Sequence, residues 1–443
     1  MNSTNQSLKP LTTKINESGN LEIGGCDLTD LADKYGTPLY VIDEYTLRSI
    51  CWDYKKAFKD FGKMNFLYAS KALCTQAVAK IVHEEGFGFD VVSSGEIYTV
   101  YKAGVDMSKV LFNGNNKSVE EITLAVELSV GRISVDNFFE LSLLDEIAKS
   151  HNKTVDILLR ITPGIECHTH EYIQTGHLDS KFGFDLTQID EAIELVLNNY
   201  KNLKIHGLHA HIGSQIFETS IYADEIEILT KEIARIEDKF GIKLNEINIG
   251  GGLGVKYTEE DCPPSIFDVA EIILNKLDSC IKKYNIEPPA IFLEPGRSII
   301  STSGVTLYTL GSSKQVPKGK KYVAVDGGMA DNVRPSMYGA EYYAEIANKP
   351  DKECVNNVTI AGRFCESGDI LIKDIKLPEI EEGDILCVYN TGAYNYSMSS
   401  NYNRVQKPCM VLVNNSQSDI IVSRETLDDI VSHDEIPGRL NGK

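Results

Sequence analysis

Eight short apolar runs recur between about residues 62 and 296, and amphipathic stretches separate them. In stretches such as 75–85, 118–128 and 138–149, apolar residues recur at i, i+3 and i+4 with charged residues between, as in an amphipathic helix. Strands that alternate with helices indicate a parallel sheet, and eight repeats close a TIM (β/α)8 barrel. The predicted strands are Met64–Ala69, Phe87–Val92, Val110–Phe112, Ile133–Val135, Ile157–Ile161, Ile205–Ala210, Glu246–Ile249 and Ile291–Leu293.

The pattern changes after residue 296. Helical periodicity becomes scarce, and short alternating runs between turn residues are typical of an all-β sandwich or barrel. The first 44 residues hold too little apolar surface to fold alone. We therefore predict an α/β protein with an N-terminal segment, 1–44, that joins the β domain, a barrel, 45–296, and a C-terminal β domain, 297–443.

Composition narrows the class of protein. Hydrophobic residues make up 42% and charged residues 24% of the 443, which is ordinary for a globular protein. No run approaches the roughly 18 apolar residues of a spanning helix, and the polar N-terminus predicts no secretory signal. The net charge of −20 argues against nucleic acid and anionic membrane as partners. The ten cysteines form no C-x-x-C pair, which predicts reduced thiols in a cytoplasmic protein.

Polar residues and glycines follow every predicted barrel strand, at the end where TIM barrels build active sites. A single polar strand end has a plain structural explanation, but a lysine, two histidines, three glycines, arginines and a carboxylate together favour a functional rim. These strand ends are Ser70-Lys71, Ser93-Ser94, Asn113-Gly114, Asp136-Asn137, Arg160, His209 with His211, Gly250–Gly252 and Glu294–Arg297.

Lys71 directly follows the apolar run 64–70. A lysine near apolar walls has a lowered pKa and can form a Schiff base with an aldehyde. For an isolated lysine, a salt-bridged or snorkelling side chain would be the simpler interpretation. The other rim residues favour the chemical role.

Glu294 ends the last predicted strand in the run Leu-Glu-Pro-Gly-Arg. A carboxylate there could bind a pyridine nitrogen and keep it protonated, which makes the ring an electron sink. An ion pair with an arginine is the structural alternative. The glycines 250–252 would let backbone N–H groups approach a phosphate, and Arg297 could bind that phosphate or a substrate carboxylate.

His209 and His211 lie two residues apart at the end of one predicted strand, so their side chains share a face. The pair could ligate one metal, as in zinc hydrolases, and His168, His170 and His177 are the candidates to complete such a site. We favour an imidazole packed over an aromatic cofactor ring, with Ser214 donating to its phosphate. No metal is predicted.

With these residues in place, the chain resembles the diaminopimelate decarboxylases, alanine-racemase-like (fold type III) enzymes that use pyridoxal 5'-phosphate (PLP). The resemblance extends from Gly36 to the tail near Val411. The matching runs are Tyr68–Ala72, Phe89–Glu96, Lys181–Gly183, His209–Ser214, Gly250–Gly254, Glu294–Arg297, Cys365–Asp369 and Gly392–Tyr394.

The resemblance implies a role for each matching residue. Lys71 would hold the cofactor covalently, His211 would stack on its ring, and Glu294 would pair with the pyridine nitrogen. Alanine racemases place an arginine at the position of Glu294, so the glutamate favours decarboxylation. The implied catalytic residues are Lys71, Cys365, His211 and Glu294. The implied cofactor-binding residues are Lys71, Asp90, Arg160, His211, Ser214, Gly251, Gly252, Glu294, Gly296, Arg297 and Tyr394.

The family also implies a reaction, the decarboxylation of meso-2,6-diaminopimelate to L-lysine in the last step of lysine biosynthesis. Cys365 and Glu366 would reach the site from the partner subunit of a homodimer with shared active sites, the cysteine as proton donor and the glutamate as a ligand for the distal amino group. The implied substrate-binding residues are Arg297, Arg334, Tyr338, Glu366 and Tyr394.

Other functions stay open at this point. The nearest alternative is a related decarboxylase acting on ornithine, arginine or carboxynorspermidine. Ornithine-type enzymes typically carry Asp after the interface cysteine, whereas this chain has Glu366, and Arg334 suits a diacid. A catalytically inactive regulator and the metal hydrolase are further alternatives. Two slight departures from the family, Phe364 and the segment 338–340, lie near the substrate residues, and residues 167–179 are a candidate lid.

Overall fold

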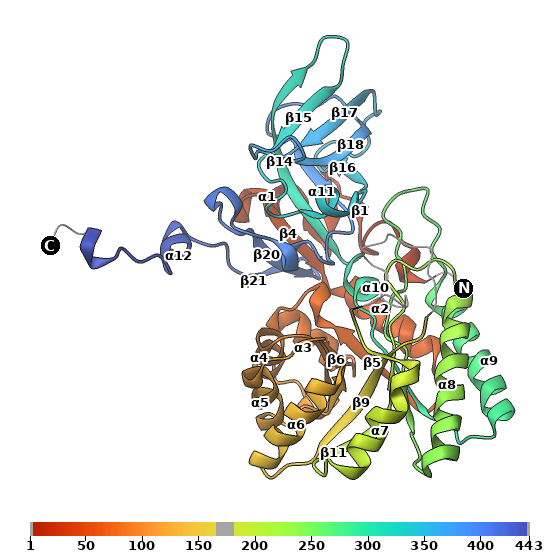
Figure 1. The fold of residues 1–443 in the computed structure, drawn as a ribbon. Helices are drawn as coiled ribbons and strands as arrows, with labels where there is room; N and C mark the ends of the chain where they lie inside the picture. The colour runs from red at the N-terminus through yellow and green to blue at the C-terminus, as the bar shows by residue number, and fades with distance from the viewer. Residues whose placement is uncertain (1–2, 165–180, 441–443) are drawn as a thin grey trace. The chain divides into compact units, whose positions relative to one another are not determined.

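A computed structural model describes residues 3–164 and 181–440 of the chain. The chain divides into two compact units, shown in Figure 1. The barrel unit comprises residues 1–7, 46–256 and 260–302, and the β unit comprises residues 8–45, 257–259 and 303–443. The boundary after the barrel therefore falls at residue 302 instead of 296, and residues 1–7 group with the barrel instead of the β unit.

Eight parallel strands close the barrel in the described residues, because β8 pairs with both β7 and β9. Each predicted run overlaps one of these strands, and the predicted TIM barrel is confirmed. A short strand, β10 (Phe184–Asp185), adds to the side of β9. The barrel strands are β5 (Met64–Ala69), β6 (Gly88–Val91), β7 (Val110–Phe112), β8 (Arg132–Val135), β9 (Val155–Thr162), β11 (Leu203–His209), β12 (Glu246–Asn248) and β13 (Ala290–Leu293).

Polar residues between the barrel strands and the next helices cap those helices. The side chains of Ser93, Ser118 and Asn137 accept hydrogen bonds from backbone N–H groups in the first turns of α4, α5 and α6, which satisfies donors that a helix leaves unpaired. Each cap fixes where the chain leaves the rim. The helices of the barrel unit are α2 (Glu44–Ala57, from residue 46 onward), α3 (Gln76–Glu84), α4 (Ser94–Lys102), α5 (Val119–Glu127), α6 (Phe138–Ser150), α7 (Ile189–Asn198), α8 (Ser220–Phe240), α9 (Ile266–Tyr284) and α10 (Arg297–Ile300).

The β unit contains a sheet in the strand order β18-β17-β15-β14-β4-β20-β21. The N-terminal strand β4 lies inside this sheet, antiparallel to β14 and parallel to β20, so residues 39–43 are part of its core. The elements are β1 (Lys14–Ile15), β2 (Leu21–Ile23), β3 (Cys26–Asp27), α1 (Leu28–Tyr35), β4 (Leu39–Asp43), β14 (Gly304–Gln315), β15 (Lys321–Val325), α11 (Arg334–Tyr338), β16 (Ala344–Ile346), β17 (Asn356–Ala361), β18 (Ile370–Leu377), β19 (Ile385–Val388), β20 (Cys409–Asn414), β21 (Gln417–Val422) and α12 (Leu427–Val431).

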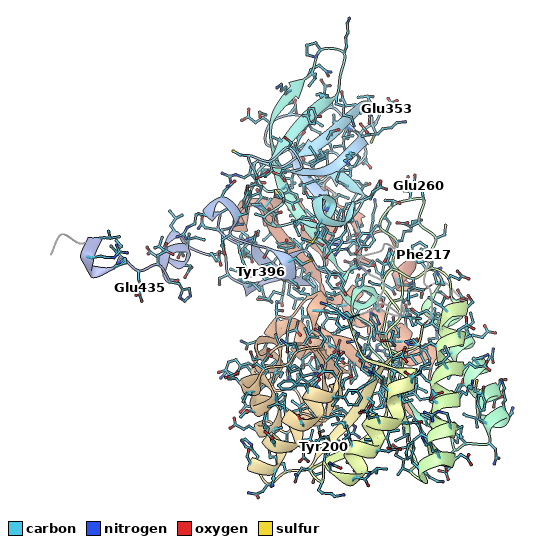
Figure 2. All side chains as sticks on the ribbon, in the orientation of Figure 1. Tyr200, Phe217, Glu260, Glu353, Tyr396 and Glu435 are labelled. Carbon is cyan, nitrogen blue, oxygen red and sulfur yellow. The ribbon has the colours of Figure 1, made fainter. Side chains whose placement is uncertain are left out.

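The C-terminal stretch of the β unit is exposed almost throughout. Apart from the partly buried Ile430, every residue from 426 to 440 is exposed. Figure 2 shows the side chains around Glu435 pointing into open space. In the described residues, no helix has both the length and the apolar character that crossing a bilayer requires.

Candidate active site

The barrel unit brings its predicted site residues to one end of the barrel, where the parallel strands finish. Asp90 and Arg160 lie near the carboxyl ends of the strands β6 and β9. Lys71 lies in the 3-10 turn (Ser70–Ala72) that directly follows β5. His209 is the last residue of β11, and Glu294 directly follows β13. The loops of this rim hold the predicted residues His211, Ser214, Gly251, Gly252 and Gly296. Arg297 is the first residue of α10, directly after them.

Glu294 is a buried carboxylate with polar donors around it. Asn248 Nδ2 donates to Glu294 Oε1 at 2.7 Å and Asn113 Nδ2 at 3.3 Å, and His209 Nε2 lies 3.5 Å away. Burial opposes the ionised form, but the neighbouring imidazole of His209 and ammonium group of Lys71 favour it. Together they lower the pKa of Glu294 to about 2. Glu294 therefore carries a negative charge at neutral pH.

Asp90 is the second buried carboxylate of the rim. Asn113 Nδ2 donates to its Oδ1 at 2.6 Å. Burial and the nearby charge of Glu294 raise the pKa of Asp90 to about 7. Two interacting carboxylates titrate as a pair, and Glu294, which has the two amide donors, keeps the charge.

The two histidines have different partners. Ser134 Oγ lies 2.7 Å from His209 Nδ1, and the backbone N–H of Gly251 donates to His211 Nδ1 at 3.2 Å. Burial lowers the pKa of both rings, so both are neutral at neutral pH. No group of three or more metal-ligating side chains is found in the described residues. His168, His170, His177 and the candidate lid, 167–179, lie outside those residues.

The loop after β12 passes very close to neighbouring backbone. A Cβ atom on Gly251 would lie 2.1 Å from the carbonyl oxygen of Glu294, and Gly252 has a φ of +110°. Only glycine fits both conditions. Beside this loop, Arg297 Nη2 donates to Ser214 Oγ at 3.0 Å. A guanidinium, a hydroxyl and backbone N–H groups are the donors that bind a phosphate.

Lys71 and Arg160 contribute positive charge to the rim. Lys71 is exposed, so its side chain is not enclosed by the apolar walls that we expected. Its ammonium group still favours the ionised forms of Asp90 and Glu294. Arg160 is 8% exposed and packs over the ring of Phe182, with its carbon Cζ 4.3 Å from the ring centroid.

The β unit carries the other predicted residues. Arg334 begins α11, and its guanidinium lies between two tyrosine rings, 5.1 Å from the centroid of Tyr338 and 5.3 Å from that of Tyr394. Arg334 is only 8% exposed. Its Nε is buried and has no hydrogen-bond acceptor in the described part of the chain.

Cys365 and Glu366 lie on an exposed turn that the side chain of Asp369 holds in place. The carboxylate of Asp369 accepts hydrogen bonds from the backbone N–H groups of Phe364, at 2.9 Å, and Met329, at 2.7 Å. Cys365 is an exposed free thiol, and the hydroxyl of Tyr402 donates to the carboxylate of Glu366. The turn thus presents a thiol and a carboxylate at the surface of the β unit.

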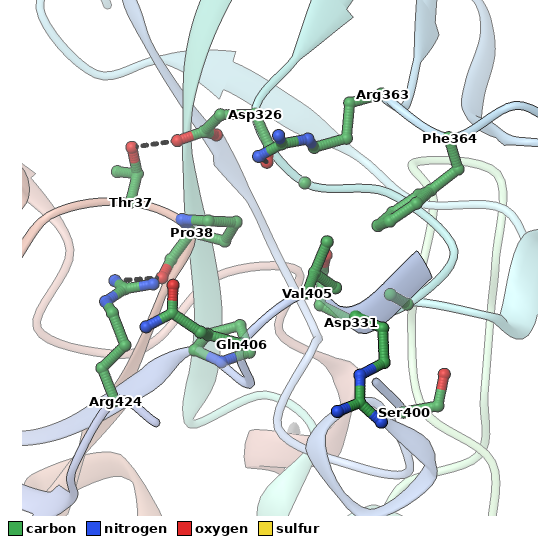
Figure 3. Close-up of a pocket in the computed structure, with 14 residues that line it drawn as sticks. Thr37, Pro38, Asp326, Asp331, Arg363, Phe364, Ser400, Val405, Gln406 and Arg424 are labelled. Carbon is green, nitrogen blue, oxygen red and sulfur yellow. Dashed lines mark hydrogen bonds between the residues drawn. The ribbon is translucent and has the colours of Figure 1, made fainter. Parts of the chain in front are cut away.

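A cavity of about 400 Å3 lies beside this turn in the β unit. Figure 3 shows Arg363 and Phe364, which directly precede Cys365, on its wall. None of the predicted substrate-binding residues lines it. No sequence pattern predicts this cavity, because its wall combines segments that are far apart in the chain.

Sequence reasoning missed several residues that hold the site together. Asn248 lies two residues before the glycines 250–252, and an amide at a strand end was a usable signal. Ser134 and Lys117 gave no comparable signal, because their partners are close only in the folded chain. Asp369 belongs to the family-matching run Cys365–Asp369, but no role was predicted for it.

Comparisons with known proteins agree on one family. The pyridoxal-binding domain of the pyridoxal-dependent decarboxylases matches residues 47–301. The diaminopimelate decarboxylase of Bacillus subtilis (strain 168) is 47% identical over 426 residues, which cover 96% of this chain and 97% of that protein.

Solved structures give the same result. The diaminopimelate decarboxylase of M. jannaschii in co-complex with L-lysine superposes with a TM-score of 0.92 at 35% identity, covering 98% of this chain and 100% of the other. The enzyme of Helicobacter pylori complexed with L-lysine gives a TM-score of 0.83 at 33% identity, covering 91% of this chain and 98% of the other.

Proposed function

The chain belongs to the diaminopimelate decarboxylases, a family of PLP-dependent carboxy-lyases, and we propose from this premise the roles of its residues. The reaction is the decarboxylation of meso-2,6-diaminopimelate to L-lysine and carbon dioxide, the last step of lysine biosynthesis.

Arg334 carries the proposal for a diacid substrate. A buried guanidinium whose Nε has no acceptor in residues 3–164 and 181–440 is costly unless a ligand supplies one. A carboxylate fits, because it can accept two parallel hydrogen bonds from a guanidinium. Diaminopimelate keeps a second carboxylate at its distal end, whereas ornithine and arginine have none. The aromatic rings of Tyr338 and Tyr394 would keep water away from this contact.

The rim of the barrel unit fits PLP. The ionised Glu294 would accept a hydrogen bond from the protonated pyridine nitrogen, and Lys71 offers the amine that binds an aldehyde. Ser214, Arg297 and the backbone of Gly251 and Gly252 would hold the phosphate, and His211 would cover the ring. When bound, PLP supplies an electron-poor ring that stabilises the negative charge left on carbon after carbon dioxide departs.

The proton that completes the reaction needs a donor. We assign it to the thiol of Cys365, which is exposed and free. Glu366, next to it, would bind the distal ammonium group of the substrate. Both residues would act in the site of the partner subunit of a homodimer. The Asp369 contacts hold the turn that presents them.

We place the protein in the cytoplasm. All nine cysteines in the described residues are free thiols, and free thiols are typical of a reducing compartment. Its partners would be the amino-acid substrate and a second copy of the chain. No nucleic acid or membrane partner is proposed.

A panel of substrates tests the proposal. Purified protein with PLP is incubated separately with meso-diaminopimelate, L-ornithine, L-arginine and carboxynorspermidine, and carbon dioxide and amine products are quantified. We expect lysine from meso-diaminopimelate alone, and none from Lys71→Ala. A product from another substrate would overturn the roles of Arg334 and Glu366. No product and no PLP absorbance would contradict the catalytic role altogether.

Arg334→Met tests the carboxylate contact by itself. The variant should raise KM for meso-diaminopimelate about 10- to 100-fold, the size expected from losing a charge-assisted hydrogen bond. Arg235→Met, which removes a guanidinium from the surface of α8, is the matched control and should leave KM unchanged. An equal KM in both variants would contradict the assignment.

A further inference from the structure

Lys117 and Glu140 form a buried ion pair at the carboxyl end of the barrel strands. Their side chains are 1% and 3% exposed, and Lys117 Nζ lies 2.6 Å from Glu140 Oε1. The ammonium group also donates to the backbone carbonyls of Ser134, at 2.7 Å, and Gly114, at 2.8 Å. All three of its N–H groups therefore have acceptors.

The other oxygen of Glu140 is used as well. The backbone N–H of Asp136 donates to Glu140 Oε2 at 3.0 Å. The pair thus joins the main chain after β7, the end of β8 and the first turn of α6. A buried ion pair gives little net stability, because desolvation offsets the attraction between the charges. What this pair fixes is the position of the main chain at Ser134.

Ser134 links the pair to the cofactor site. Its hydroxyl lies 2.7 Å from His209 Nδ1, and His209 Nε2 lies 3.5 Å from Glu294 Oε1. A carboxylate can only accept a hydrogen bond, so the neutral ring faces Glu294 favourably when its proton is on Nε2. Nδ1 then accepts a hydrogen bond from the Ser134 hydroxyl. Ser134 is fully buried, so water cannot replace it.

We propose that Lys117, Glu140 and Ser134 are positioning residues of the cofactor site, which hold the His209 ring with its Nε2 proton toward Glu294. The ion pair sets the main chain of Ser134, and the Ser134 hydroxyl sets the ring. This proposal rests on the proposed function, because Glu294 is assigned there to the pyridine nitrogen. None of the three residues needs to touch the cofactor.

The same strand offers a matched control at its other end. Arg132, at the start of β8, makes two hydrogen bonds with Glu246, at the start of β12, at 2.7 and 3.0 Å. The side chain of Arg132 is 24% exposed and that of Glu246 is 9% exposed, so this pair is also mostly buried. Its removal should disturb the barrel without reaching Ser134.

The experiment compares Lys117→Met/Glu140→Leu and Ser134→Ala with the control Arg132→Met/Glu246→Leu. The ring nitrogens of His209 are observed by 15N NMR in the full-length chain, with assignment by His209→Asn, and the dissociation constant of PLP is measured by titration. We expect both rim variants to shift the His209 signals and to weaken PLP binding about 10- to 100-fold, as for outer partners of a ligated histidine. The control should change neither quantity.

Unchanged His209 signals and PLP affinity in Ser134→Ala would overturn the proposal, even where the double variant does not fold. Equal effects in the rim variants and the control would also overturn it, because they would reflect general loosening of the barrel. The decarboxylation assay of the wild type separates the two proposals. If the wild type is inactive but Ser134→Ala still shifts the His209 signals and weakens PLP binding, only the proposed function is contradicted.

Discussion

The amino and carboxyl ends of the barrel strands differ in how completely their buried polar side chains are paired. At the amino end, Arg132, Asp156, His206 and Glu246 contact one another, and none of them has a buried side-chain atom without a partner. At the carboxyl end, buried polar atoms such as Asn113 Oδ1 and Asp136 Oδ1 have no hydrogen-bond partner among the described residues. Buried polar groups in folded proteins are normally paired. The amino end is therefore complete by itself, and the carboxyl end is built to receive a ligand.

The largest expected effect comes from Glu294, because its charge faces the proposed cofactor. Glu294→Gln keeps the shape and removes the charge, and we expect kcat to fall about 100- to 1000-fold, as when one preorganised electrostatic contact is lost. Steady-state decarboxylation measures this. An unchanged kcat would mean that Glu294 is only a structural acceptor for Asn113 and Asn248.

The next effect concerns the pH dependence of stability. The pKa of Asp90 is raised to about 7 in the folded protein, against about 3.8 for the unfolded chain. The folded state therefore binds the extra proton, and this contribution to stability is lost as the pH rises toward 7. Asp90→Asn should gain stability relative to wild type between about pH 4 and pH 7, and no further gain is expected above.

Urea unfolding of wild type and Asp90→Asn at several pH values measures this difference. Asp156→Asn at the amino end is the control, since its carboxylate is partly exposed and paired. A difference between wild type and Asp90→Asn that stays constant with pH would show that Asp90 is ionised in the folded protein.

At the amino end of the barrel strands we expect a substitution to lower stability and to leave activity unchanged. Arg132→Met leaves the largely buried Glu246 without its main partner, which should lower the free energy of unfolding by about 3 kcal/mol or less, because Arg132 is a quarter exposed. The specific activity of the folded variant should stay at the wild-type level. Loss of activity without loss of stability would contradict the division between the two ends.

The smallest effect is expected on the outer surface. Arg235→Ala on α8 breaks contacts with Asp190 and Glu232, in which the arginine and Asp190 are about a third exposed. Exposed pairs contribute about 0.2–1 kcal/mol, so the shift in the unfolding midpoint should be small and activity unchanged. A shift as large as that of Arg132→Met would mean that burial does not rank these ion pairs.

The sequence predicted the barrel well because both signals are local. Short apolar runs and helices of period 3.6 mark the elements, and the chemistry-bearing residues follow the strands directly, as Lys71 and Glu294 do. Short elements were not predicted. β16 has three residues and α11 has five, which is too few for a periodic pattern to be recognised. Arg334 was singled out by family resemblance and not by pattern.

Long-range contacts also escaped prediction. Lys117 and Glu140 are 23 residues apart in the chain, and Ser134 and His209 are 75 apart. Nothing in a run of residues indicates that such side chains meet. The exposure of Lys71 could not be predicted for a related reason: the apolar strand before it says little about the surroundings of a residue beyond its end.

The affinity for PLP of two variants, measured side by side, tests the difference between the two ends most directly. Glu294→Gln and Arg132→Met each remove one charge from a strand end of the same barrel. We predict a clearly raised dissociation constant for PLP in Glu294→Gln and the wild-type value in Arg132→Met. Equal dissociation constants in the two variants would contradict the claim that the carboxyl end alone is built for the cofactor.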